Sequence, residues 1–368
     1  MKVVFDHQIF CIQNLGGISR YFTNIFKYIK SHQCDIQGEL SVKYSDNIYI
    51  KNISHDIENP PWFLKNNFIG KKFFLERINR FYTNRLIEKI DFDVFFPTYY
   101  STYFLDKIKQ PYVLTVHDMT HEHFPEIFYK NKDFTLNYKR KAIENAAHLI
   151  AISENTKKDL LKYYNVAKEK ISVIYHGIEQ DYSTQSVTKF NDPFFLFVGE
   201  RGGYKNFEIV LRALSALQNK SINLISTGKS FSKREKGQLK KYGLEYRVIA
   251  LHLTDSQLNY LYENAVALVY PSLYEGFGYP LLEAMRASCV VITSNSSCLP
   301  EIGGDAALYF NPLIVEELIG KMQYVLSLSM SEKSDIISRG AKNLLRFTLK
   351  ESMDKTISVI KGVASKNF

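Results

Sequence analysis

The segment from Tyr270 to Ala284 contains residue types that suit a phosphorylated ligand rich in hydroxyl groups. Two carboxylates separated by seven residues could accept hydrogen bonds from different parts of one such ligand. Glycines let backbone N–H groups approach closely, and Pro280 suits the first turn of a helix whose N-terminus favours phosphate. A turn with two solvated glutamates is the alternative. The residues expected to bind are Glu275, Gly276, Phe277, Gly278 and Glu283.

Two basic residues, Arg201 and Lys205, follow the predicted strand 194–198. From that position their charges could reach a diphosphate. Fixed cations aimed at a developing negative charge lower a reaction barrier, and loss of one such group typically costs about 2–4 kcal/mol. The alternative is a solvated pair of side chains flanking a turn, which would contribute little.

A histidine and an acid, His117 and Asp118, come directly after the predicted strand 112–116. Side chains at the carboxyl ends of parallel strands project toward the ligand-binding edge of a sheet, so we expect a functional role for both. Gly16 and Gly17 open the predicted helix that follows the first strand. They either line a binding loop or simply permit a tight connection.

Short apolar runs with helical patterns between them must position these residues, and this alternation is typical of parallel sheets wound with helices. We therefore expect an α/β fold with two Rossmann-like domains facing a cleft, because ligands bind at the carboxyl ends of such strands. The predicted strands are residues 2–5, 94–96, 112–116, 148–152 and 171–174, then 194–198, 222–226, 246–250, 266–270 and 289–293.

Length also favours two domains, because 368 residues exceed the usual size of one. The polar stretch 177–192 lacks apolar periodicity and ends just before a strong strand, so we place the boundary near residue 185. The expected parts are a first domain over 1–185, a second domain over 186–345, and a final segment over 346–368.

The chain resembles the retaining nucleotide-sugar glycosyltransferases of family 4, also called group 1, which have the GT-B fold. Five landmarks in the expected order carry the resemblance over nearly the whole chain. It implies transfer of a sugar from a nucleoside diphosphate to an acceptor hydroxyl, with retention at the anomeric carbon. The landmarks are residues 16–20 (GGISR), 117–118 (HD), 199–206 (GERGGYKN), 275–283 (E-x7-E) and 299–304 (LPEIGG).

The resemblance implies that the domain 1–185 is the acceptor side, that the domain 186–345 binds the nucleotide sugar, and that the helix 346–368 packs back on the first domain. It also implies roles for single residues. His117, Asp118 and Glu275 would contact the transferred sugar and are the catalytic candidates, while Glu283 would accept hydrogen bonds from the ribose. Arg201 and Lys205 would hold the diphosphate, and the loop at Gly16 and Gly17 would lie near the donor phosphates and the acceptor. No second catalytic carboxylate is identifiable by motif, which favours front-face substitution. Glu200 departs from many members of the family.

The composition limits the kinds of molecule that the chain is expected to bind. Apolar residues make up 45% and charged residues 23%, which excludes a disordered chain, and the net charge of +9 suits anionic partners. No Walker A loop, nucleic-acid module, 18-residue apolar span or signal-peptide pattern occurs, so we expect a cytoplasmic protein that binds no nucleic acid. The cysteines fit reduced thiols without a metal, and they are Cys11, Cys34, Cys289 and Cys298.

Two further stretches allow more than one interpretation. Asp91 and Asp93 spell D-x-D, a metal signature of a different glycosyltransferase fold, but we interpret them as a solvated turn and expect no metal or other cofactor. Residues 62–82 interleave aromatic and basic side chains. That stretch is either an interfacial segment facing anionic lipid at the inner face of the plasma membrane or an amphipathic helix packed on the first domain.

The favoured function is sugar transfer to a glycan or lipid-linked acceptor in the synthesis of a bacterial surface polysaccharide, an O-antigen or a capsule. The resemblance favours GDP-mannose as the donor, with UDP-sugars close behind. Two alternatives stay open at this point: a nucleotide-sugar 2-epimerase, which shares the two-domain fold, and a non-catalytic subunit of a glycosylation complex.

Overall fold

The computed structural model describes residues 1–31, 35–53, 70–130, 135–187 and 192–365, with the single residues 57, 61, 64, 68 and 190. Two compact units divide the chain: residues 1–176 with the segment from Lys350 onward, and Gly177–Leu349. The division falls after His176 rather than near residue 185, because residues 177–185 bond to the second unit. There the Ile178 N–H donates to the Phe347 carbonyl and the Gln185 N–H to the Ser256 carbonyl.

The first unit contains a parallel sheet in two three-stranded parts, ordered β2-β1-β3 and β4-β5-β6. An isolated parallel bridge between Phe95 and Tyr112 joins the parts. The inner strands are buried, as parallel strands covered on both faces must be. Their bounds are β1 Lys2–Phe5, β2 Gln37–Leu40, β3 Val94–Phe96, β4 Val113–Val116, β5 His148–Ala151 and β6 Ile171–Val173.

Helices cover this sheet, and α2 shows why they form. Its apolar residues recur every three or four positions, so one stripe that includes Phe22 and Phe26 is buried against the rings of Phe5 and Phe96. The helices are α1 Gln8–Ile12, α2 Gly17–Lys30, α4 Lys71–Ile87, α5 Thr120–His123, α6 Pro125–Lys130, α7 Thr135–Glu144, α8 Glu154–Tyr163 and α16 Leu349–Ala364.

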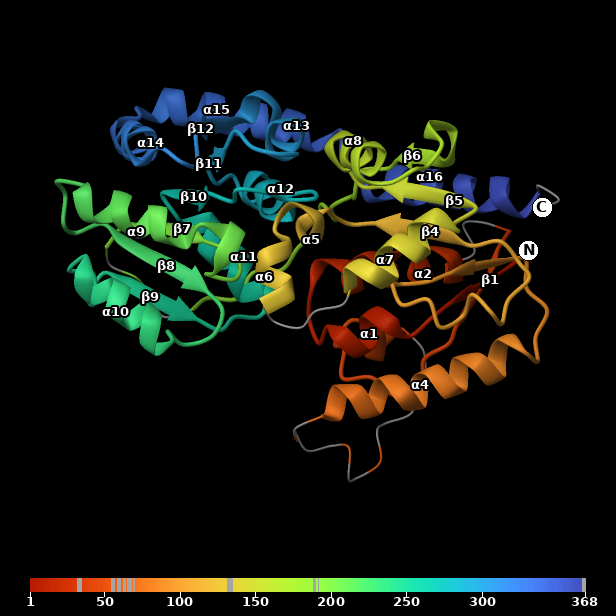
Figure 1. The fold of residues 1–368 in the computed structure, drawn as a ribbon. Helices are drawn as coiled ribbons and strands as arrows, with labels where there is room; N and C mark the ends of the chain where they lie inside the picture. Colours follow the sequence, from red (N-terminus) through yellow and green to blue (C-terminus); the bar gives the residue numbers. More distant parts are fainter. Residues whose placement is uncertain are drawn as a thin grey trace. The chain divides into compact units, whose positions relative to one another are not determined.

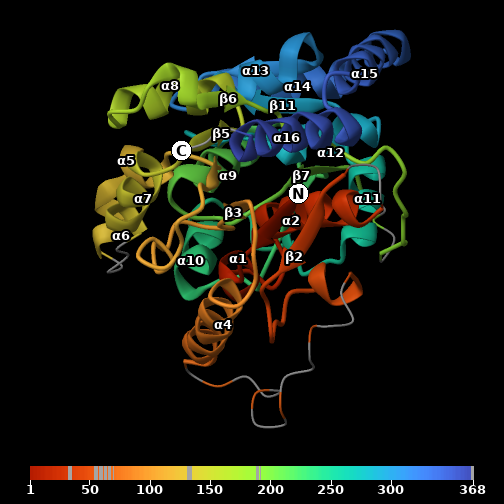
Figure 2. The same ribbon diagram turned by 90° about the vertical axis from the view of Figure 1, so that its right-hand side faces the viewer.

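The C-terminal helix α16 belongs to the first unit although it follows the second in sequence. The Tyr28 hydroxyl on α2 donates to Asp354 on α16 at 2.5 Å. The two helices therefore lie side by side, as Figures 1 and 2 show.

The second unit contains one parallel six-stranded sheet in the order β12-β11-β10-β7-β8-β9. Counted along the chain this is the doubly wound Rossmann order, which reverses direction between β7 and β10 (Figure 1). Ligands of such sheets bind beyond the carboxyl ends of the strands at that reversal. The strands are β7 Phe194–Phe197, β8 Asn223–Thr227, β9 Val248–Leu251, β10 Ala267–Tyr270, β11 Val291–Ser294 and β12 Ala307–Phe310.

The core of this unit joins the buried strands to α9 and α14, which pack together. Thr254 and Gln257 form a capping box at the start of α11. The helices are α9 Phe207–Ala216, α10 Lys233–Lys241, α11 Asp255–Asn264, α12 Tyr279–Arg286, α13 Leu299–Gly303, α14 Val315–Ser327 and α15 Met330–Leu344.

Candidate functional site

Lys205 and Glu275, expected at one site from sequence, meet at the reversal point of the second sheet. The Lys205 Nζ lies 2.7 Å from Oε1 and 3.0 Å from Oε2 of Glu275. It also donates to the Tyr270 hydroxyl at 3.2 Å. Both charged side chains are mostly buried, with exposed fractions of 16% and 11%. The loops after β7 and β10 thus hold a cation and a carboxylate in contact.

The backbone conformation and two hydrogen bonds hold the loops after β7 and β10 in place. Gly199 has a φ of +125°, a conformation that L side chains rarely adopt, and its N–H donates to the Thr227 hydroxyl at 3.1 Å. The Leu273 N–H donates to the Tyr204 carbonyl at 2.7 Å, which ties the loop after β10 to the loop after β7. The tie brings the neighbouring residues Lys205 and Glu275 within reach of each other.

The Arg201 side chain links the loop after β7 to the loop after β8. Its Nε lies 2.6 Å from Oε1 of Glu235, and its two terminal nitrogens donate to the carbonyls of Thr227 and Lys229. Burial opposes ionisation of Glu235, but hydrogen bonds from Ser232 and the Arg201 charge outweigh it and lower the pKa of that carboxyl. A guanidinium has five N–H groups, so two remain for a ligand.

The loop 275–278 (Glu-Gly-Phe-Gly) is held by hydrogen bonds to residues at the start of α13. The Glu275 N–H donates to the Ser297 hydroxyl at 3.0 Å, and the Cys298 thiol contacts the carbonyls of Glu275 and Phe277. Gly278, with a φ of +111°, is the N-cap of α12. This helix end, with Pro280 in its first turn, presents backbone N–H groups suited to an anion.

Glu283 lies within α12 and is 9% exposed. Its Oε2 accepts a hydrogen bond from the Tyr262 hydroxyl of α11 at 3.1 Å. Glu275 instead pairs with Lys205. The two glutamates of the motif therefore have different partners in this structure.

His117 is buried at the end of β4 in the first unit. Its N–H donates to the Tyr100 hydroxyl at 3.1 Å, but neither ring nitrogen has a hydrogen-bond partner among the described residues. Burial is the main cause that lowers the pKa of the His117 imidazole to about 4; the Asp118 charge opposes this shift and the Lys139 charge adds to it. The neutral ring could donate one hydrogen bond and accept one.

His176 was not identified from the sequence. Its ring stacks on His117 with centroids 6.0 Å apart, and the Tyr21 ring lies 4.5 Å from it. Burial, His117 and Arg20 hold the pKa of His176 well below its ordinary value. The available signal was that His176 follows the strand 171–174, just as His117 follows its own strand in the same sheet.

Asp118 is held in place by backbone bonds and a buried lysine. Its Oδ1 accepts from the Thr120 N–H at 2.9 Å, and its carbonyl accepts from the Lys139 Nζ at 2.6 Å. Burial raises the pKa of the Asp118 carboxyl, but Lys139 and Thr120 outweigh this and leave it lowered. Lys139 is fully buried and forms an ion pair with Glu122 at 2.9 Å. Sequence reasoning missed Lys139 because ion pairing of a buried lysine is a tertiary property.

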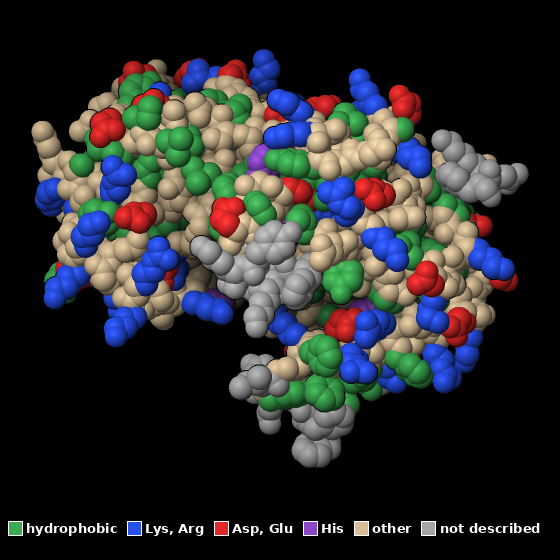
Figure 3. All heavy atoms as spheres, in the orientation of Figure 1, with side chains coloured by type: hydrophobic (Ala, Val, Ile, Leu, Met, Phe, Trp, Pro, Cys, Tyr) green, Lys and Arg blue, Asp and Glu red, His purple; other side chains and the backbone are tan. Residues whose placement is uncertain are grey.

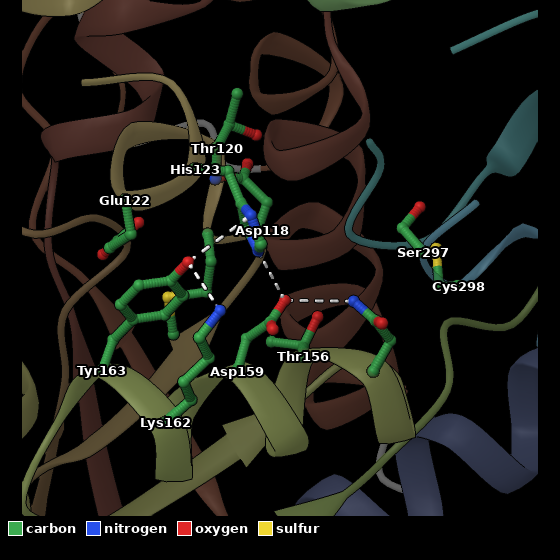
Figure 4. Close-up of polar contacts among 12 residues, drawn as sticks. Asp118, Thr120, Glu122, His123, Thr156, Asp159, Lys162, Tyr163, Ser297 and Cys298 are labelled. Atoms are coloured by element: carbon green, nitrogen blue, oxygen red, sulfur yellow. Dashed lines mark hydrogen bonds and ion pairs between the residues drawn. The ribbon is translucent and has the colours of Figure 1, made fainter. Parts of the chain in front are cut away.

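A histidine and a carboxylate meet between α5 and α8. The His123 Nε2 lies 3.2 Å from Oδ2 of Asp159, which also accepts from the Asn155 amide at 3.1 Å. Figure 4 shows the two side chains pointing toward each other, with Tyr163 beside His123. The carboxylate orients the imidazole. No sequence signal linked these residues, which lie on separate helices.

Gly16 and Gly17 start α2 as expected, with Gly16 as the N-cap. The side-chain oxygen of Gln13 accepts from the Ser19 N–H at 3.2 Å, so the protein itself caps this helix end. A Cβ atom at Gly16 would lie 2.4 Å from that oxygen, which the end of a flexible side chain could relieve. The Gln13 side chain thus occupies the space that a side chain at residue 16 would need.

The D-x-D pair lies at the other end of the first sheet. Asp93 Oδ2 accepts from the Lys2 N–H at 2.6 Å, and Asp93 N–H donates back to the Lys2 carbonyl. Asp93 therefore ties β1 to the segment before β3. In the part of the chain that the structure describes, no cluster of three metal-ligating side chains occurs, and no helix is long and apolar enough to cross a membrane.

The aromatic and basic stretch 62–82 lies partly outside the described residues: Trp62, Phe63, 65–67 and Ile69 are not among them. The remainder forms most of α4. Two of its basic residues are engaged internally: Lys71 is buried and pairs with Asp46 at 2.6 Å, and the Lys72 Nζ donates to the Ile12 carbonyl.

One face of α4 is exposed and carries Phe73, Arg77, Phe81 and Arg85 at four-residue spacing. The phenylalanines are 60% and 62% exposed. The Arg77 guanidinium lies 5.5 Å from the Phe73 ring and that of Arg85 lies 4.9 Å from the Phe81 ring. Figure 3 shows the green and blue side chains gathered along α4. We call these four residues the α4 stripe.

Two family profiles match consecutive parts of the chain. One is described as Glycosyltransferase Family 4 and matches residues 15–182, and the other is described as Glycosyl transferases group 1 and matches residues 179–344. Together they match most of the chain, in the same two-part order as the units.

Among curated relatives, O-antigen chain mannosyltransferase RfbU of Salmonella typhimurium is 32% identical over 201 residues, 54% of this chain and 56% of that protein. The alignment thus spans about half the length of that relative. O-antigen chain mannosyltransferase B of Escherichia coli is 26% identical over 72% of this chain and 73% of its own length. Mannosyltransferases are hexosyltransferases, so these relatives agree with the expected enzyme class.

Solved structures share the fold. Sucrose-phosphate synthase from Thermosynechococcus elongatus superposes with a TM-score of 0.78 at 16% identity and covers 98% of both chains. Anabaena HepE in complex with UDP-glucose superposes with a TM-score of 0.74 at 16% identity, over 98% of this chain and 100% of the other. The expected GT-B fold is confirmed.

Proposed function

This chain belongs to the family 4, group 1 glycosyltransferases, and from that premise we propose that it is a hexosyltransferase that moves mannose from GDP-mannose to a glycan hydroxyl. The mannosyltransferase relatives support the choice of sugar. One structural observation carries the chemistry: Lys205 and Glu275 meet at the reversal point of a Rossmann sheet, beside a helix N-terminus. A diphosphate is the ligand that such a position suits.

In the proposed reaction, the donor diphosphate draws the Lys205 ammonium away from Glu275. The freed carboxylate then accepts hydrogen bonds from the sugar hydroxyls. Lys205, the two remaining N–H groups of Arg201 and the start of α12 stabilise the charge that develops on the leaving diphosphate. His117, neutral at pH 7 because its pKa is about 4, hydrogen-bonds the sugar.

We propose that the reaction retains the anomeric configuration. In this reaction the freed Glu275 carboxylate accepts hydrogen bonds from the sugar hydroxyls, so it is not the attacking nucleophile. A front-face substitution meets this constraint: the acceptor oxygen attacks from the side of the departing phosphate, and that phosphate takes the acceptor proton. An α-linked donor would then give an α-linked product.

A donor panel tests the function. Wild-type protein is incubated with GDP-mannose, UDP-glucose, UDP-galactose or UDP-N-acetylglucosamine and mannose-containing acceptors, and the products are analysed by mass spectrometry and NMR. The proposal expects an α-mannoside from GDP-mannose alone. Epimerised donor, a β-mannoside, or no product from wild-type protein would each contradict it. As a control, Lys229→Ala removes an exposed charge from the same unit, and it should give the same products as the wild-type protein.

We also propose that the acceptor is lipid-linked and that the α4 stripe rests on an anionic bilayer at the cytoplasmic face of the membrane. Exposed phenylalanines alternating with arginines suit the boundary between acyl chains and anionic headgroups. Each basic residue at the surface contributes about 1 kcal/mol of attraction. Lys71 and Lys72 belong to the same basic stretch 62–82, but they already have partners within the protein.

Liposome sedimentation tests this contact. The double variant Arg77→Ser/Arg85→Ser should bind vesicles of phosphatidylglycerol and phosphatidylethanolamine roughly 30-fold more weakly, because about 2 kcal/mol is lost. The control Lys236→Ser/Lys240→Ser removes the same charge from exposed positions of α10. Equal losses in both variants, or no binding by wild-type protein at low salt, would contradict the proposal.

A further inference from the structure

A small pocket in the first unit is not explained by donor binding. Its volume is about 180 Å³, and it lies where α1, the loop after β3, α4 and α7 meet. Gln8 and Tyr100 follow β1 and β3, so the pocket lies beyond the carboxyl ends of two adjacent strands. That edge of a parallel sheet is where ligands bind.

The walls of the pocket combine aromatic faces with hydrogen-bonding groups. Tyr99 and Tyr100 lie together with ring centroids 4.6 Å apart, and Tyr138 of α7 is 52% exposed. Ser101 and Glu76 add polar groups to the lining. Flat apolar rings beside a few fixed polar groups suit the C–H face and hydroxyl edge of a pyranose.

The described lining of the pocket offers a phosphate no cation. It contains no lysine or arginine, and its one charged side chain is the Glu76 carboxylate, which pairs with Arg80 at 3.6 Å. A carboxylate accepts hydrogen bonds from sugar hydroxyls. The described lining therefore fits an uncharged sugar ring better than the nucleotide part of the donor.

The floor of the pocket is rigid and is linked to His117. Gln8 is buried, donates to Asp6 Oδ2 at 2.7 Å and accepts from the Ser101 N–H at 2.7 Å. Tyr100, in the pocket wall, has its hydroxyl 3.1 Å from the His117 N–H. A sugar seated against Tyr100 would thus be positioned by the residue that also holds the His117 backbone.

We propose that this pocket is the acceptor subsite and binds one uncharged pyranose of the acceptor glycan, with Tyr99 and Tyr138 as its aromatic contacts. The assignment rests on the proposed glycosyltransferase function. It places acceptor recognition wholly on residues of the first unit, apart from Lys205, Arg201 and Glu275 of the second.

Binding is measured first without any reaction. Saturation-transfer NMR of the full chain with methyl α-mannopyranoside and with mannobiose should show transfer from protein to ring protons. Tyr138→Ala should weaken that binding roughly 3- to 10-fold, the range expected for losing one aromatic contact. Tyr246→Ala, a 95% exposed tyrosine of the second unit, should change nothing. Absence of transfer in wild-type protein, or equal transfer in Tyr138→Ala, would overturn the assignment.

Kinetics then separate this inference from the function it rests on. Tyr138→Ala should raise the KM for the acceptor and leave both the KM for the donor and the hydrolysis of donor by water unchanged. An unchanged acceptor KM in an active enzyme would overturn the subsite alone. An inactive wild-type protein that still binds mannobiose through Tyr138 would overturn the proposed function and leave the sugar site standing.

Discussion

The two units carry their candidate residues in opposite electrostatic states. In the second unit Lys205 and Arg201 are mostly buried, and each is matched by a carboxylate. In the first unit His117 is buried, its pKa is lowered to about 4 by that burial, and its ring nitrogens have no partner among the described residues. Lys205 and Arg201 are charged and paired, whereas the His117 ring is neutral and its nitrogens have no hydrogen-bond partner among the described residues.

This difference separates two tasks. A lysine paired with a glutamate can exchange that partner for a phosphate and remain paired itself, so the second unit suits an anionic ligand. A buried neutral imidazole cannot hold an anion well, but it can hydrogen-bond a hydroxyl that enters. In the proposed reaction, the diphosphate of the donor suits the first of these environments and the sugar suits the second.

The largest expected effect on stability concerns the buried ion pair of the first unit, between Lys139 and Glu122. Lys139→Met would leave Glu122, whose side chain is 5% exposed, without its cation. We expect the free energy of unfolding to fall by about 3–5 kcal/mol in urea titrations. Lys355→Met breaks the exposed pair with Glu351 and should cost at most about 1 kcal/mol. Similar losses in the two variants would show that the buried Lys139–Glu122 pair stabilises the fold no more than an exposed pair does.

Next in size is the loss of the cation in the second unit. Lys205→Ala should lower kcat/KM by about 30- to 1,000-fold, because it removes one group that stabilises the leaving diphosphate. Circular dichroism should show an unchanged fold, since the side chain keeps some exposure. A reduction below threefold in steady-state transfer assays would remove Lys205 from the reaction.

Acid should destabilise the protein through its buried histidines. Burial lowers the pKa of His7 and of His117 from 6.5 to about 4. Between these pH values the unfolded chain binds more protons than the folded chain, so the free energy of unfolding falls as the pH drops from 7 toward 4. The loss approaches about 3 kcal/mol for each histidine. Urea titrations of His117→Gln should show a shallower pH dependence, and an identical dependence would contradict the lowered pKa.

Much of the fold could be predicted from the sequence, because each of the ten predicted apolar runs forms a strand within one or two residues. The two strands that were missed, β2 and β12, are edge strands. The segment QGEL of β2 has no continuous apolar run and none of its residues is buried, so its sequence gives no strand signal. The segment ALYF of β12 is apolar but only four residues long, and a run of that length does not distinguish a strand from a helix.

The site was predictable only where a motif carried it. Lys205 and Glu275 were both identified and lie in contact. The burial of Lys71 was not predictable, because it depends on Asp46, which the fold brings to α4 from a distant segment. The same holds for the stacking of His176 on His117.

Calorimetric titration of the full chain with GDP tests the central claim most directly, because GDP has the diphosphate but no sugar. Lys205→Ala should weaken binding by at least tenfold. Glu275→Gln should strengthen it several-fold, since Lys205 loses its competing carboxylate. His117→Gln should leave GDP affinity unchanged while lowering transfer. Unchanged GDP affinity in Lys205→Ala, or a loss in His117→Gln as large as in Lys205→Ala, would contradict the division of labour between the two units.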